Sequence, residues 1–231
     1  MESYVEPIGV IVLMIVIALL SIRYVREKVA NVLSITLVLL CWLCLEIGWI
    51  EKNYLSIFTV LVFILVISVN WRSIDIRCDW SLKKSCLKTI GLIFLVTLSA
   101  IIPLAFGLGL VRFSVTELWF QHPWTLAIIL PLFLFAKALP EELIFRGIIQ
   151  NLLMKRLNVF WAITLAAIIF GLAQINKPAW LFPNWYGIIL ATIIGASCGY
   201  VYWRCKSLIS AVLLHFLIDV SWWMLLIEVG S

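Results

Sequence analysis

The residues best suited to chemistry lie in an apolar stretch in the second half of the chain. Lys137, Glu141, Glu142 and Arg146 place four charges within ten residues. A charge near the centre of a bilayer costs about 2.5–3.5 kcal/mol on insertion scales, so charges retained in apolar helices indicate functional sites. Lys137 and Glu141, and likewise Glu142 and Arg146, are four residues apart and can pair on one helix. Paired carboxylates suit general acid–base chemistry. Two stabilising salt bridges are the alternative, although apolar residues would hold a bundle together at lower cost.

Two later stretches carry further polar groups at the same spacing. His215 and Asp219 are four residues apart in an apolar segment, and so are Phe170 and Gln174. Counted at about 1.5 Å per residue from the ends of their helices, Glu142, Gln174, His215 and Asp219 all lie near the middle of the bilayer. We therefore expect them to line one buried polar site. Pro140 removes a backbone donor and should kink the helix just before the two glutamates.

The elements that position these residues are membrane-spanning helices. The 231 residues are 65% hydrophobic and only 13% charged, and the apolar residues are spread along the whole chain. Apolar runs of this length without alternating polarity form helices in lipid. We predict an all-α polytopic bundle of about eight spans, near 8–22, 29–50, 55–69, 90–110, 124–154, 159–175, 185–203 and 207–228.

The basic residues indicate the orientation of these spans. Under the positive-inside rule, connections rich in Lys and Arg face the cytoplasm, so both termini should lie outside. We expect an integral protein of the plasma (inner) membrane of a prokaryote, with its site open to the cytoplasmic side. The twelve residues on the predicted inner side are Arg23, Arg26, Lys28, Arg72, Arg77, Lys83, Lys84, Lys88, Lys155, Arg156, Arg204 and Lys206, against Lys52, Arg112 and Lys177 outside.

The chain reads as a single integral membrane domain, 1–231, because it has no internal repeat or flexible linker. Residues 1–122 contain no motif, and residues 123–228 form the predicted catalytic-type core. In the seventh span, small residues at every fourth position should let a neighbouring helix approach closely. These residues are Gly187, Ala191, Gly195 and Gly199.

Several classes of function and cofactor are not indicated. The net charge of +5 is small and dispersed, so a nucleic-acid partner is not expected. The chain has two histidines, and His122 lies far from the other polar motifs. No His-Glu-x-x-His or Gly-x-Ser-x-Gly motif occurs, so we predict neither a metal, nor a cofactor, nor a serine nucleophile. The expected partners are the lipid bilayer and a peptide or membrane-protein substrate, and the oligomeric state is not predicted.

Three motifs in succession resemble those of the CPBP family, the CAAX-protease and bacteriocin-processing family of intramembrane proteases. They are Glu141-Glu142-x-x-x-Arg146, Phe170-x-x-x-Gln174 and His215-x-x-x-Asp219. The resemblance covers about residues 125–225. It implies that Glu141 activates a water for attack on a peptide carbonyl, and that His215 and Asp219 stabilise the oxyanion. Glu142 and Gln174 complete the expected catalytic set, with Arg146, Lys137 and Phe170 as structural support.

One position departs from the family pattern, which has His where this chain has Gln174. An amide can orient a water but cannot accept a proton at neutral pH. The first hypothesis is therefore a metal-independent, glutamic-type intramembrane endopeptidase. The alternative is a catalytically impaired relative that binds a peptide or a partner membrane protein, or that acts in immunity. A small proton-coupled transporter is a third hypothesis, disfavoured because no inverted repeat is apparent.

Overall fold

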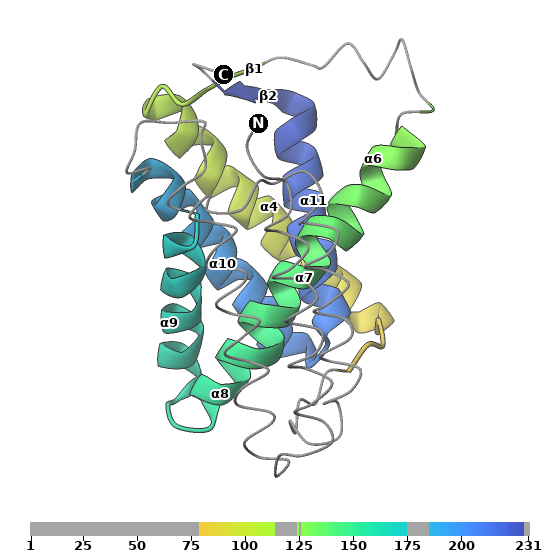
Figure 1. Cartoon of the computed structure of the whole chain (residues 1–231), viewed down its shortest axis with the longest axis vertical. Coiled ribbons are helices and arrows are strands. Elements are labelled where there is room, and N and C mark those ends of the chain that lie inside the picture. Colours follow the sequence, from red (N-terminus) through yellow and green to blue (C-terminus); the bar gives the residue numbers. More distant parts are fainter. Residues whose placement is uncertain (1–78, 114–123, 125, 175–184, 229–231) are drawn as a thin grey trace, which may run out of the picture. The chain divides into compact units, whose positions relative to one another are not determined.

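The computed structural model describes residues 79–113, 124, 126–174 and 185–228. All of them belong to one compact unit, Arg77–Ser231. The first three predicted spans lie outside the described residues, so the total of eight spans, the outward termini and the single domain remain predictions. The helices of this unit, shown in Figure 1, are α4 (Lys84–Gly107), α6 (Leu126–Leu132), η2 (Phe133–Ala138), α7 (Leu139–Glu142), η3 (Leu143–Gln150), α8 (Asn151–Met154), α9 (Val159–Leu172), α10 (Trp185–Cys205) and α11 (Leu208–Leu225).

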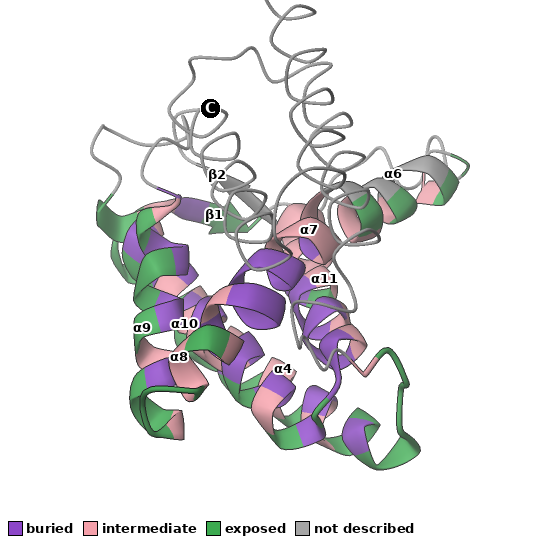
Figure 2. Cartoon of the chain, turned by 60° about the horizontal axis from the view of Figure 1, so that its bottom comes forward, coloured by how far each residue is buried: buried purple, intermediate pink, exposed green. Residues whose placement is uncertain are grey.

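Three of the described helices are long and apolar enough to cross a membrane, where the sequence predicted five spans in this part of the chain. They are α4, α10 and α11, of 24, 21 and 18 residues. At about 1.5 Å per residue they match a hydrocarbon core of about 30 Å. The apolar helix α9 is shorter, with 14 residues. Large apolar side chains such as those of Leu92, Leu95 and Phe160 are exposed, which suits contact with lipid. Figure 2 marks the exposed positions of the helices in green.

The predicted fifth span is one helical run, but much of it is wound more widely than an α-helix. The π-helices η2 and η3 flank the single α-helical turn α7, which contains Pro140. In an α-helix the proline ring clashes with the carbonyl four residues earlier, and the wider turn of η2 relieves this contact. Pro140 is thus accommodated within the run by π-helical turns.

A short two-stranded ribbon joins the ends of α4 and α11, although the sequence predicted helix over residues 226–228 and a connection after residue 110. Strand β1 (Val111–Phe113) pairs antiparallel with β2 (Leu226–Glu228), so the last span ends at Leu225 and not at 228. Gly109 has a φ of 68°, a conformation that favours glycine, and it turns the chain between α4 and β1. Because the two helices end beside each other, their following residues can satisfy one another's backbone groups.

At the opposite ends of α4 and α11, two basic connections meet. Ser207 Oγ donates to the carbonyl of Ser81 at 2.8 Å, and the Leu208 N–H donates to the carbonyl of Asp79 at 3.0 Å. The charge pattern predicted that these connections share one side of the membrane, and the structure places them together. That this side faces the cytoplasm remains a prediction.

Glycines allow α9, α10 and η3 to pack closely, as the small-residue stripe predicted. A methyl group added to Gly195 would lie 3.1 Å from Ala167 Cα and from the Phe170 ring. One added to Gly199 would lie 2.8 Å from the Gln150 side-chain oxygen. Buried residues line the facing sides of these helices (Figure 2). This packing brings polar side chains of η3 against the backbone of α10.

Candidate active site

The innermost part of the site is an ion pair between Glu142 and Arg146, as the spacing predicted. Glu142 Oε1 accepts from Arg146 Nη1 at 2.8 Å, and both side chains are fully buried. Arg146 Nη2 donates to the carbonyl of Gly195 on α10 at 2.8 Å, and the guanidinium lies 4.9 Å from the centre of the Phe170 ring. Charge-assisted bonds of this kind compensate the cost of removing two charges from water.

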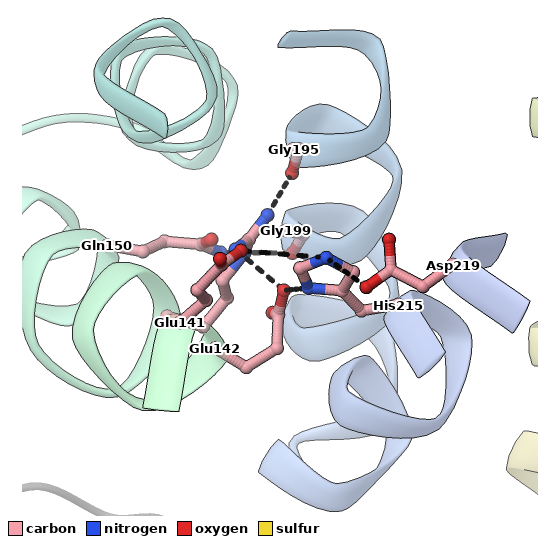
Figure 3. A network of polar contacts seen from close by, with 8 residues as sticks. Glu141, Glu142, Gln150, Gly195, Gly199, His215 and Asp219 are labelled. Carbon is pink, nitrogen blue, oxygen red and sulfur yellow. Dashed lines mark hydrogen bonds and ion pairs between the residues drawn. The ribbon is translucent and has the colours of Figure 1, made fainter. Parts of the chain in front are cut away.

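His215 of α11 joins the two glutamates, as Figure 3 shows. Its Nδ1 lies 2.8 Å from Glu142 Oε1. Its Nε2 lies 3.7 Å from Glu141 Oε2 and 3.5 Å from Asp219 Oδ2. An ionised carboxylate only accepts hydrogen bonds, so Nδ1 donates its proton to Glu142. In the neutral ring, the Nε2 lone pair then faces Glu141 and Asp219, at distances too long for direct hydrogen bonds.

Lys137 has a different partner from the one that its spacing predicted. Its Nζ lies 2.7 Å from Asp219 Oδ2 on α11, while Glu141 faces His215. The predicted pair of Lys137 with Glu141 assumed four-residue spacing on an α-helix. Lys137 lies in the π-helix η2, so α-helical spacing does not determine which side chain it meets, and its ammonium contacts Asp219 of α11.

Accessibility divides these residues into an inner and an outer group. The Lys137 side chain is 34% exposed, and those of Glu141 and Asp219 are 12% and 11% exposed, whereas that of His215 is 3% exposed. The outer group is Lys137, Glu141 and Asp219, and the inner group is Glu142, Arg146 and His215. We call the six residues Lys137, Glu141, Glu142, Arg146, His215 and Asp219 the polar cluster.

The charges of the polar cluster leave it able to accept a proton. Its three carboxylates face two permanent cations, Lys137 and Arg146. With a neutral His215 the cluster carries one net negative charge, and one added proton neutralises it. Such a cluster can remove a proton from a water held beside it, which is the function of a general base.

Gln174 is buried but is not joined to the polar cluster by any hydrogen bond within the described residues. Its backbone N–H donates to the Gly171 carbonyl at 3.0 Å, in the turn after α9. Its side-chain amide has no hydrogen-bond partner in the described part of the chain. The second motif reaches the cluster through Phe170, whose ring packs edge-on against His215 with centroids 5.6 Å apart.

The polar contacts one turn beyond Arg146 were not predicted from the sequence. Gln150 Nε2 donates to the carbonyl of Gly199 at 3.0 Å, and Asn151 Nδ2 donates to Tyr202 Oη at 2.8 Å. With the bond from Arg146 to Gly195, they attach η3 and α8 to α10 along one line. The available signal was the small-residue stripe, because a glycine leaves its own carbonyl open to a neighbouring side chain.

Three buried residues, Glu142, Cys198 and His215, offer ligand atoms within 4.8 Å of one another. Glu142 Oε1 and His215 Nδ1 are already hydrogen-bonded to each other at 2.8 Å. Arg146 Nη1 lies 2.8 Å from the same carboxylate oxygen, so a metal ion bound there would lie beside a guanidinium in a poorly screened interior. The donor set therefore does not favour a metal.

Residues 123–221 match the family described as Rce1-like, type II CAAX prenyl endopeptidase. This match contains all three motifs and confirms the resemblance to the CPBP family, which is a family of membrane proteases. Comparison with curated proteins and with solved structures gave no match.

Proposed function

We propose that this protein is an intramembrane endopeptidase of the CAAX-protease type. Its substrate would be a membrane-associated peptide or protein, cleaved with a water that Glu141 activates. The observation that carries this proposal is the position of His215, which is bonded to Glu142 on one side and faces Glu141 and Asp219 on the other. The family match supports a peptidase.

In the proposed reaction, the water lies beside Glu141 Oε2 and His215 Nε2. Glu141 takes one proton from this water while the water oxygen bonds to the carbonyl carbon of the substrate. The electron pair of the carbonyl π bond moves to the carbonyl oxygen. When the intermediate collapses, the C–N bond breaks and Glu141 returns the proton to the leaving amine. Gln174 would help to orient the water, since an amide can donate and accept hydrogen bonds.

Glu142 and Arg146 have a positioning role in this proposal. Glu142 fixes the His215 tautomer through Nδ1, and Arg146 holds Glu142 while it is itself held by the Gly195 carbonyl. A His whose second nitrogen is fixed in this way keeps its ring oriented during proton transfer. The proposed reaction needs no metal, and the donor set of Glu142, Cys198 and His215 does not favour one.

The proposed location is the plasma (inner) membrane of a prokaryote, with the site open to the cytoplasmic side. The basis is the distribution of basic residues, together with the meeting of the connections at Asp79 and Ser207. The outer group of Lys137, Glu141 and Asp219 would face the substrate. The matched family is described as a CAAX prenyl endopeptidase. The first substrate to test is therefore a peptide with a farnesylated cysteine near its C-terminus.

The second candidate function is binding without catalysis, in a peptide-binding, immunity or partner-binding protein. Gln174 favours it, because this residue places an amide where the family pattern has an imidazole. The third hypothesis, a transporter, gains no support from the protease family match.

The test is peptide hydrolysis in proteoliposomes, followed by mass spectrometry, first without and then with a chelator. We expect the wild type to cleave the peptide, and Gln174→His to cleave it faster, since a positioned acid–base group typically contributes about 10²–10⁴-fold. Asp79→Asn is the control, because Asp79 is an exposed carboxylate outside the polar cluster. Cleavage by Gln174→His alone would favour an impaired relative. Absence of cleavage by both proteins would overturn the proposed function, and loss of cleavage on adding the chelator would overturn metal independence.

A further inference from the structure

Two basic connections meet at one end of the described unit, and the proposed reaction uses none of their cations. The bonds from Ser207 to the Ser81 carbonyl and from the Leu208 N–H to the Asp79 carbonyl hold the segment before α4 against the connection from α10 to α11 (Figure 1). We call three exposed cations at this end the basic junction: Lys84, which begins α4, Arg204, in the last turn of α10, and Lys206, just after it.

The charges of the basic junction have no acidic partner in the described part of the chain. Asp79 is the acidic residue of these two connections there, and its carboxylate accepts from the Ser81 N–H at 2.8 Å and lies 3.5 Å from the Lys83 ammonium. The basic junction itself forms no ion pair within the described residues. Cations held near one another repel, and an anion bound between the two connections would compensate this repulsion.

Lys206 occupies a backbone conformation that is unusual for lysine. Its φ is 55°, and its N–H donates to the Tyr202 carbonyl at 2.8 Å, which ends α10. Glycine is the usual residue in this left-handed conformation after a helix, because a side chain there introduces strain. The Lys206 ammonium lies 5.9 Å from the centre of the Trp203 ring. The chain thus holds a cation at the junction, over an aromatic ring, where glycine would fit the backbone better.

The surroundings of the basic junction are those of a lipid headgroup. The apolar helices α4 and α11 begin here and α10 ends here. The Trp203 ring packs against that of Tyr200 with centroids 5.9 Å apart, and such rings are enriched at the level of the headgroups. Leu82 and Leu87, on either side of Lys84 in the chain, are 42% and 50% exposed. Cations beside exposed apolar side chains suit a phosphate that carries acyl chains, whereas a soluble anion would use the cations alone.

We propose that the basic junction binds the phosphate of an anionic phospholipid, with its acyl chains along the exposed apolar side chains at the start of α4. Lysine and arginine donate charge-assisted hydrogen bonds to phosphate oxygens. An anionic lipid such as phosphatidylglycerol is favoured over phosphatidylcholine, whose own ammonium compensates its phosphate. The inference does not depend on the proposed function, because no residue of the polar cluster takes part.

The test is native mass spectrometry of the full chain in detergent, with phosphatidylglycerol or phosphatidylcholine added at equal concentrations. A basic residue near an anionic lipid surface contributes about fivefold in affinity, so Lys84→Gln with Lys206→Gln should weaken binding of the first phosphatidylglycerol by about 20–30-fold. Lys84→Arg with Lys206→Arg keeps both charges and should bind like the wild type. The control is Arg112→Gln with Arg156→Gln, which removes two exposed cations elsewhere and should change the affinity by less than about twofold.

Three results would overturn the inference. Equal weakening in the control would show attraction by net charge without a site, and equal affinity of the wild type for phosphatidylcholine would show no selection of an anion. Displacement of phosphatidylglycerol by inorganic phosphate at the same concentration would show that a free anion is the occupant. Unfolding midpoints in the same detergent verify folding, and Arg204→Gln replaces Lys206→Gln if that double variant does not fold. Because the readout is lipid binding, failure of the cleavage assay leaves this test unaffected.

Discussion

Removal of the Arg146 guanidinium should destabilise the protein far more than removal of an exposed cation at the same spacing. Arg146 is buried, and its two bonds of 2.8 Å reach the carboxylate of Glu142 and the carbonyl of Gly195. In Arg146→Met, the fully buried Glu142 carboxylate loses its cation. Breaking a buried ion pair by removing one partner costs about 3–5 kcal/mol. The lost contact with the Phe170 ring is included in this range, since such contributions are not additive.

The chain provides a matched control. Lys83 and Asp79 form an exposed ion pair at 3.5 Å with the same four-residue spacing. Lys83→Met should leave the free energy of unfolding unchanged within error, because exposed pairs contribute little. The double variant Arg146→Met with Glu142→Gln should recover part of the loss, because it removes the unpaired buried charge.

The assay is equilibrium unfolding in mixed micelles with increasing SDS, followed by the fluorescence of the 12 tryptophans. If Arg146→Met changed the free energy of unfolding by less than about 1 kcal/mol, Glu142 would not depend on Arg146 for its charge compensation. An equal loss in Lys83→Met would show that burial is not the reason for the effect.

Two other predictions concern packing and topology. Gly171→Ala should destabilise the protein by about 1–3 kcal/mol in the same assay, because its methyl would lie 2.7 Å from the Ile188 carbonyl oxygen. Gly91→Ala, whose added methyl would have no atom of the described residues within 4 Å, should stabilise helix α4 by about 0.5–1 kcal/mol, and a loss equal to that of Gly171→Ala would contradict the packing argument. In a cysteine-free background, an impermeant maleimide added to intact cells should label a cysteine at position 3 and not one at position 79; the reverse pattern would refute the orientation.

The sequence predicted where the described helices lie and which six residues form the polar cluster, but it also placed Gln174 in this site, and Gln174 makes no hydrogen bond to the cluster within the described residues. Lipid restricts the backbone to helices, so apolar length alone located α4, α9, α10 and α11. Charges are costly in such helices, so Glu142, Arg146 and His215 stood out before any contact was known. The four-residue spacing of Glu142 and Arg146 also gave their ion pair correctly.

The details that were missed depend on departures from regular helices and on tertiary packing. The π-helical turn at Lys137 and the pairing of this residue with Asp219 had no signal in the sequence apart from Pro140 nearby. The ribbon of β1 and β2 forms because α4 and α11 end side by side, which one-dimensional hydropathy does not show. The bond from Gln150 to Gly199 likewise requires knowing that η3 packs on α10.

The measurement that tests the central claim most directly is the rate of peptide cleavage by Glu141→Gln, compared with the control Asp79→Asn at equal protein in the same proteoliposomes. Glutamine is close in size to glutamate but cannot take the proton from the attacking water. Glu141→Gln should lose cleavage, by at least about 10²-fold, while Asp79→Asn should cleave like the wild type. Cleavage by Glu141→Gln at the wild-type rate would contradict a glutamate-activated water at this site.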